Sequence, residues 1–161
     1  MLDSSTLSYN NINVVIKFMY NLLKAIKSIH DNNYIHLDLK PENILLENIY
    51  DSFINIKNIE FAVVDFGGAK NSSTDNSRII NGQMASAAFS PPEIIDIKFG
   101  RKSDIWAYGI ICYLVCCKTT FIKSIGNNIF MNNNMKELKL NIDNAIDKLE
   151  NNYNILKPFL K

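Results

Sequence analysis

The residue types that could support chemistry are concentrated in four short segments of the chain. The first segment places a carboxylate, a cation and an amide close together, at Asp38, Lys40 and Asn43. A second carboxylate, Asp65, follows a short apolar run. Each of these residues alone is typical of a solvated surface, so their order and spacing must carry any functional interpretation. In chain order, the segments are 36–43 (HLDLKPEN), 65–67 (DFG), 91–93 (PPE) and 104–109 (DIWAYG).

Together and in this order, the segments resemble the C-terminal lobe of a eukaryotic protein kinase of the serine/threonine type. Segment 36–43 matches the catalytic-loop pattern H-R-D-L-x-x-x-N at every position but one. The DFG and PPE segments follow at the spacing that is typical of the family. The resemblance covers the chain from about Leu7 to Phe121. It implies a protein-kinase-like C-lobe, a fold that is mainly α with a small β hairpin.

The resemblance implies that the polar residues transfer the γ-phosphoryl group of ATP to a protein hydroxyl. Asp38 is expected to accept or orient the proton of the substrate hydroxyl, and Lys40 to neutralise charge on the transferring phosphate. Asn43 and Asp65 are expected to bind the cofactors ATP and Mg²⁺, since amide and carboxylate oxygens are the hard donors that this ion requires. Phosphoryl transfer needs mainly positioning and charge neutralisation from the protein.

Further residues match structural or regulatory positions of the family. Ser86 lies where the family usually has a Thr that bonds the catalytic Asp and Lys, and together with Lys40 it favours Ser/Thr over tyrosine substrates. Glu93 normally pairs with an Arg in a later helix, but no Arg follows Arg101 in this chain. The complete set of these structural or regulatory residues is His36, Phe66, Gly67, Ser86, Glu93 and Asp104.

Leu37 departs from the family pattern. The usual Arg at this position pairs with a phosphorylated residue of the activation loop and orders that loop by charge-assisted hydrogen bonds. Leucine cannot do so. The hypothesis is therefore that the hydroxyl residues of the following loop are not activating phosphosites acting through residue 37; these are Ser72, Ser73, Thr74 and Ser77.

The elements that must position the site follow from hydrophobic periodicity. Apolar residues recur at helical spacing over 14–30, which predicts an amphipathic helix. Two β-type runs, 43–46 and 61–64, predict the strands of a hairpin. The stretch 47–60 between them reads as an expanded hairpin loop, with another strand expected at 53–56.

The second half of the chain gives weaker signals. The stretch 67–90 carries no periodicity, and connections of that length are usually functional or disordered. Ser103 or Asp104 is expected to cap a helix over 105–117, which is apolar nearly all round and should therefore be buried. A pattern at 141–149 predicts a further amphipathic helix.

Composition excludes several classes of protein. The 161 residues and 18.4 kDa fit one domain, and a net charge of +1 gives no reason to expect nucleic-acid binding. The longest apolar run is shorter than the roughly 20 residues that span a bilayer, and no secretory signal opens the chain. The clustered cysteines Cys112, Cys116 and Cys117 are expected to be buried reduced thiols, which favours the cytosol or nucleus.

The sequence before Val14 contains no Gly-rich phosphate loop, no V-A-I-K lysine and no αC glutamate. We therefore interpret residues 1–161 as a partial kinase domain without its N-lobe, and residues 122–161 as a weakly matching C-terminal extension. The phosphate lid and the Lys–Glu ion pair support productive ATP geometry. The isolated chain is accordingly expected to be inactive.

Two function classes stay open at this stage. The first is a Ser/Thr kinase whose N-lobe is encoded upstream or on a separate chain and whose substrate is a protein. The second is a pseudokinase-like binding or scaffold module. In this second class, apolar surface that an N-lobe would cover binds a protein partner or drives self-association.

Overall fold

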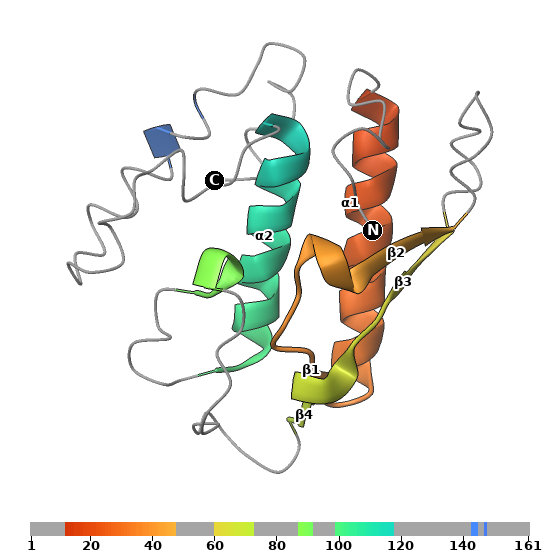
Figure 1. The fold of residues 1–161 in the computed structure, drawn as a ribbon, viewed down its shortest axis with the longest axis vertical. Coiled ribbons are helices and arrows are strands. Elements are labelled where there is room, and N and C mark those ends of the chain that lie inside the picture. The colour runs from red at the N-terminus through yellow and green to blue at the C-terminus, as the bar shows by residue number, and fades with distance from the viewer. Residues whose placement is uncertain are drawn as a thin grey trace.

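The computed structural model describes residues 12–47, 60–72, 87–91, 99–117, 143, 144 and 147. Two long helices dominate this part of the chain, α1 (Ile12–Asp31) and α2 (Arg101–Cys117), and they lie side by side (Figure 1). The strands are short: β1 Tyr34–Ile35, β2 Ile44–Glu47, β3 Glu60–Val63 and β4 Lys70–Asn71. Single turns of 3-10 helix lie at η1 Pro41–Asn43, η3 Phe66–Gly68 and η4 Ala87–Phe89. The predicted fold class, mainly α with a small β hairpin, is confirmed.

Helix α1 forms because its apolar residues recur every three or four positions and so line one face. Val15, Phe18, Leu22 and Ile26 are all buried, and each is at most 1% exposed. The helix gives way to a turn in which Asn33 has φ 61, a left-handed conformation that asparagine tolerates well. The prediction of a helix over 14–30 is therefore confirmed, with slightly wider bounds.

Helix α2 begins at Arg101, which is earlier than the predicted start at Ile105. The expectation that Ser103 or Asp104 caps this helix is wrong, because both residues lie inside its first turns. The backbone N–H of Gly100 donates to Ser103 Oγ over 3.1 Å, so Ser103 ties down the helix entry from within the helix. Asp104 is thereby left free to contact another part of the chain.

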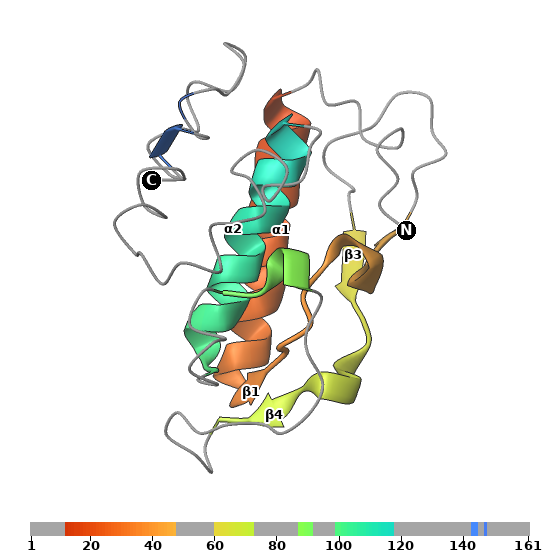
Figure 2. The same cartoon turned by 60° about the vertical axis from the view of Figure 1, so that its left-hand side comes forward.

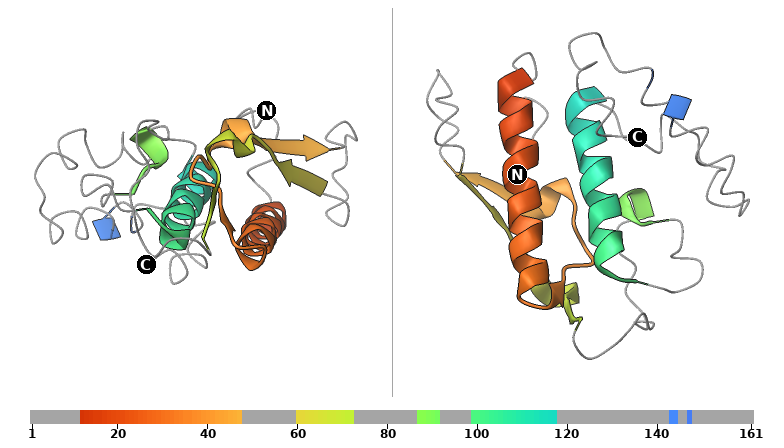
Figure 3. Two further views of the ribbon diagram at one scale, coloured as in Figure 1. Left: turned by 90° about the horizontal axis from the view of Figure 1, so that it is seen from below. Right: turned by 180° about the vertical axis from the view of Figure 1, so that it is seen from behind.

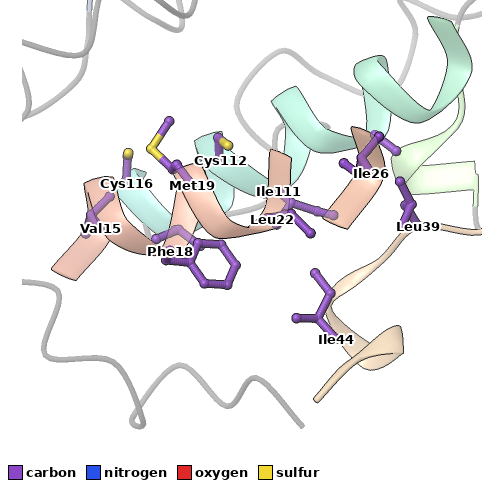
Figure 4. Packing of buried hydrophobic residues seen from close by; sticks show 12 residues of the cluster. Val15, Phe18, Met19, Leu22, Ile26, Leu39, Ile44, Ile111, Cys112 and Cys116 are labelled. Carbon is purple, nitrogen blue, oxygen red and sulfur yellow. The ribbon is translucent and has the colours of Figure 1, made fainter. Parts of the chain in front are cut away.

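The core lies between the two helices and the segment that joins β1 to β2. Figure 4 shows Phe18 and Leu22 of α1 close to Ile111 and Cys112 of α2. Cys112 and Cys116 are buried and form no disulfide with a described residue, in line with the prediction of buried reduced thiols; the side chain of Cys117 lies outside the described part of the chain. Among the described residues, no helix is long and apolar enough to cross a membrane.

Strands β2 and β3 form the predicted antiparallel hairpin, which lies beside α1 (Figure 3). Ile44 pairs with Val63 and Leu45 with Ala62. Because side chains alternate along a strand, Ile44 is fully buried whereas Leu45 is 45% exposed. The predicted loop and extra strand within 48–59 lie outside the described residues.

Strands β1 and β4 form a second antiparallel pair that the sequence did not reveal. Tyr34 pairs with Asn71 and Ile35 with Lys70, at the end of α1 where that helix gives way to the turn (Figure 2). A two-residue strand is too short to show any periodicity, so no sequence pattern could predict it. Through this pair, the segment that follows DFG lies beside the start of the catalytic loop. Of the predicted helix at 141–149, the described residues 143, 144 and 147 are helical.

Candidate active site

The predicted catalytic loop, residues 36–43, connects β1 to β2 and ends in the 3-10 turn η1. The backbone N–H of Val64 donates to the carbonyl oxygen of Asn43 over 2.9 Å, which extends the β2–β3 ladder up to Asp65. Asp65 therefore follows β3 at the same end of the hairpin at which Asn43 precedes β2. The structure thus brings together all four predicted catalytic and cofactor-binding residues: Asp38, Lys40, Asn43 and Asp65.

Asp38 is the centre of a hydrogen-bonded cluster. Lys40 Nζ donates to its Oδ2 over 2.7 Å, and Asn43 Nδ2 donates to the same oxygen over 3.2 Å and to the Asp38 carbonyl over 2.8 Å. The side chains of Asp38 and Lys40 are 23% and 22% exposed, so both can be reached from solvent. The cluster holds a carboxylate in one orientation while leaving it accessible.

The environment of Lys40 keeps its ammonium group charged. The hydrogen bond to Asp38 is the largest cause of a raised pKa for Lys40, and burial opposes it in part. The negative charges of Asp38, Glu42 and Asp65 raise the pKa of Lys40 further. A lysine that stays protonated at neutral pH can stabilise negative charge on a transferring phosphate.

Asn43 and Asp65 offer a donor set that fits a hard divalent cation. The Nδ2 group of Asn43 is engaged by Asp38, so the amide oxygen is the atom left for a ligand. Asp65 is exposed, and among the described residues its Oδ1 accepts a single long bond, 3.3 Å, from the N–H of Gly67. No group of three or more His, Cys, Asp or Glu suited to a metal occurs among the described residues. Mg²⁺ does not need such a group, because it binds through one or two carboxylates together with phosphates and water.

Asp104 fixes the backbone of the catalytic loop from helix α2. Its Oδ2 accepts from the N–H of His36 over 2.9 Å, and its Oδ1 accepts from the N–H of Leu37 over 2.9 Å. His30 Nε2 lies 2.8 Å from the same Oδ2, and Asp104 is only 1% exposed. This buried carboxylate is therefore fully engaged, and it holds the loop just before Asp38.

The same contact sustains an unfavourable backbone conformation at Leu37, whose φ is 67. A non-glycine residue in this left-handed region costs on the order of 1–3 kcal/mol and persists only where its surroundings enforce it. The hydrogen bond from Leu37 N–H to Asp104 provides that enforcement. Sequence reasoning assigned Asp104 a structural role, but it found neither its partner His30 nor the strain at Leu37.

His36 connects the catalytic loop to the DFG segment. Its Nδ1 accepts from the N–H of Asp38 over 3.3 Å, and its Nε2 donates to the carbonyl oxygen of Val64 over 3.0 Å. These two partners require the neutral tautomer with hydrogen on Nε2. The His36 ring also contacts the Phe66 ring, with centroids 4.9 Å apart. The structural or regulatory role assigned to His36, Phe66 and Gly67 stays a prediction.

Two predicted residues, Ser86 and Glu93, lie outside the described residues. The structure also reveals an exposed apolar pair beside the site that the sequence did not indicate. Leu45, two residues after Asn43, and its cross-strand partner Ala62 are both exposed and share one face of the hairpin. A large apolar residue on the solvent face of a strand indicates such a surface. The sequence alone does not show which face of the strand is buried, so it could not identify Leu45.

Comparison with known proteins agrees with this geometry. The family described as the protein kinase domain matches residues 4–161. The chain is 37% identical over 141 residues to calcium-dependent protein kinase 6 of Plasmodium berghei (strain Anka), covering 86% of this chain and 8% of that protein. It is 36% identical over 104 residues to the serine/threonine-protein kinase DCLK1 of Rattus norvegicus, covering 62% and 21%. It is 30% identical over 121 residues to calcium-dependent protein kinase 27 of Arabidopsis thaliana, covering 74% and 23%. The chain therefore spans less than a quarter of the length of each of these relatives.

Proposed function

This chain belongs to the protein kinase family, and on that premise we propose that it supplies the catalytic-loop half of an ATP-dependent protein serine/threonine phosphotransferase site. One observation carries the proposal. Asp38, Lys40 and Asn43 form a hydrogen-bonded cluster at the end of the hairpin where Asp65 emerges. The relatives include a protein named as a serine/threonine kinase, which supports the substrate class.

The geometry suggests a different role for each residue of the cluster. Asp38 Oδ2 is held by Lys40 and Asn43, whereas Oδ1 accepts no hydrogen bond from a described residue and can receive the proton of a substrate hydroxyl. The charged Lys40 stabilises negative charge on the group being transferred. Mg²⁺ bound by Asn43 and Asp65 would neutralise the phosphates of ATP. Leu45 and Ala62 offer an apolar face that suits the adenine base.

The isolated 161-residue polypeptide is expected to turn over slowly, if at all. It contains no G-x-G-x-x-G segment and no V-A-I-K lysine, which in this family cover and pair with the phosphates. The second candidate function is a pseudokinase-like module that binds a protein partner. Exposed apolar residues beside the cluster, Leu45 at 45% and Phe66 at 48%, favour this alternative.

A chimera separates the two functions. The upstream part of the kinase domain of the rat relative, joined in frame to this chain, would supply the segments that contact the phosphates. We expect the chimera to phosphorylate serine in dephosphorylated casein. Asp38→Asn should lower the rate by at least about 100-fold, because a positioned general base contributes that much or more.

The matched control is Asp31→Asn, which removes an exposed carboxylate on α1 and should leave the rate unchanged. A chimera that folds and binds ATP, yet transfers no phosphate, would favour the binding module. Transfer that is unaffected by Asp38→Asn would contradict the role given to that residue.

A further inference from the structure

The turn that follows α1 is joined to two distant segments of the chain through Asn33. The backbone of Asn33 is left-handed, with φ 61. Its carbonyl oxygen accepts from the N–H of Ser72 over 2.6 Å, and its Oδ1 accepts from Arg101 Nη2 over 3.1 Å. The same Nη2 donates to Ser72 Oγ over 3.2 Å. Asn33, Ser72 and Arg101 therefore form a closed set of contacts, which we call the latch.

The latch lies at one end of the segment that carries Asp65. Before Asp65, the Val64 N–H donates to the Asn43 carbonyl oxygen over 2.9 Å. After Asp65, β4 pairs with β1, and the bonds of Ser72 extend that pair at its far end (Figure 2). The chain over 65–69 is thus held on both sides, by the hairpin before it and by the latched strand pair after it.

Asp65 requires this support because its own backbone is strained. Its φ is 63 and its ψ is 70, a left-handed conformation. A residue other than glycine persists in this region only where its surroundings enforce it. Among the described residues, the Asp65 carboxylate accepts a single long hydrogen bond, 3.3 Å, from the Gly67 N–H. The conformation of Asp65 is therefore set mainly by what holds the chain before and after it.

We propose that Asn33 is a positioning residue for Asp65. Its amide joins the end of β4 to the start of α2, which restrains the turn from which Asp65 presents its carboxylate. The same turn of the chain at Asn33 leads through β1 into the catalytic loop, so one residue relates the two halves of the site. The step from a restrained Asp65 to Mg²⁺ binding rests on the proposed function, whereas the restraint itself does not.

Asn33→Gly tests the role of the amide while keeping the turn. Glycine adopts a positive φ without strain, and it retains the carbonyl that accepts from Ser72. The matched control is Asn32→Gly, which removes an amide from the neighbouring residue and adds a glycine to the same turn. The amide of Asn32 donates to the Ser28 carbonyl of its own helix over 2.8 Å.

The restraint is measured on the 161-residue chain by NMR. We expect the backbone N–H groups of Ser72 and Ala69 to exchange with deuterium about 5-fold faster in Asn33→Gly, since the latch loses one hydrogen bond. The N–H of Val64, on the other side of Asp65, should exchange at its unmutated rate. The scalar coupling that reports the φ angle of Asp65 should shift, because this residue leaves its left-handed conformation part of the time.

Arg101→Met removes the donor of the latch and keeps an aliphatic stem. It should produce the same local changes as Asn33→Gly, and the double variant should show no larger effect than either single one, because both remove the same contact. Lys102→Met, which removes the cation of the adjacent exposed residue, is the control and should produce none of these changes.

The proposal is overturned if Asn33→Gly leaves exchange at Ser72 and the coupling of Asp65 unchanged. It is equally overturned if Asn32→Gly has the same effect, or if exchange at Val64 rises as much, since the amide would then support the fold in general. These measurements require neither nucleotide nor turnover.

Magnesium-dependent binding of ATP, followed by the thermal midpoint, gives the functional readout. The dissociation constant should rise about 5-fold in Asn33→Gly, because binding must then restore the conformation of Asp65. An unchanged constant in a chain whose Asp65 has been released would overturn the positioning role. If the unmutated chain itself does not respond to ATP with Mg²⁺, the proposed function fails, and exchange and coupling still decide whether Asn33 restrains Asp65.

Discussion

The catalytic loop depends on one buried carboxylate that comes from a distant part of the chain. Asp104 accepts hydrogen bonds from the backbone of His36 and Leu37, and its side chain lies 2.8 Å from His30 Nε2. The left-handed backbone at Leu37 persists because of this contact. The position of Asp38 is therefore set through α2 as well as by its own neighbours.

Replacing Asp104 with Asn should weaken the fold markedly. The amide keeps one acceptor oxygen but points an NH₂ group at a backbone N–H or at His30, which leaves a buried donor without an acceptor. We expect the free energy of unfolding to fall by about 2–4 kcal/mol. Urea denaturation measures this change, with Asp31→Asn as an exposed control expected to cost no more than about 1 kcal/mol. Equal effects of the two substitutions would show that Asp104 is not the anchor of the loop.

At the scale of single residues, the sequence predicted the polar groups that the structure brings together, but not the contacts that hold them in place. Asp38, Lys40, Asn43 and Asp65 follow from a motif whose spacing is local. The contact of Asp104 with His36 joins residues that are 68 positions apart. No local pattern encodes such a contact, and none indicates a positive φ at Leu37.

At the scale of elements, α1 and α2 form the rigid frame against which the loop is packed. Leu22 of α1 is fully buried, whereas its neighbour Leu23 is 42% exposed on the same helix. Leu22→Ala should lower the free energy of unfolding by about 2–5 kcal/mol, since it removes buried methyl groups and leaves a cavity. Leu23→Ala removes the same atoms from the surface and should change it by less than about 1 kcal/mol. Similar costs at both positions, measured by urea denaturation, would contradict the assigned α1–α2 interface.

Two buried titratable groups of α2, Cys112 and Tyr108, should make the fold less stable at alkaline pH. Burial raises the pKa of the Cys112 thiol from 9.0 to about 12, and burial also raises the pKa of Tyr108. Between about pH 9 and pH 12 the unfolded chain therefore binds fewer protons than the folded one at Cys112. The free energy of unfolding should fall across this range by up to about 1.4 kcal/mol per pH unit. Urea denaturation at several pH values should show a weaker slope for Cys112→Ala, and an unchanged slope would argue against the buried thiol as its source.

The longer helices and strands could be predicted from the sequence, whereas the shortest strands could not. Helix α1 and the β2–β3 hairpin carry clear periodicity, and the structure confirms both. The sequence predicts that α2 starts at residue 105 because Ser103 or Asp104 is suited to cap it, whereas the Asp104 side chain instead binds the backbone of the catalytic loop. The β1–β4 pair is only two residues long on each strand, and it forms because the chain turns back at Asn33.

At the scale of the whole molecule, the proposed function makes these residues one part of a phosphotransferase site. In the proposed function, the described elements supply the general base, the lysine beside it and two oxygen donors for a cation. The relatives in which matching segments occur are at least four times longer than the region they share with this chain. The substrate and the regulator are therefore best sought with the complementary, phosphate-covering segments present.

Asn43 and Asp65 are proposed to hold a nucleotide through a divalent cation. The most direct test is the thermal midpoint of the purified chain, titrated with ATP in the presence and absence of Mg²⁺ and repeated on Asp65→Asn. Ligand at 100 times its dissociation constant stabilises a protein by about 2.7 kcal/mol, which gives a shift of several degrees in a domain of this size. We predict a rise that requires Mg²⁺ and disappears in Asp65→Asn. A flat response from the folded chain, or an equal rise in Asp65→Asn, would contradict the claim.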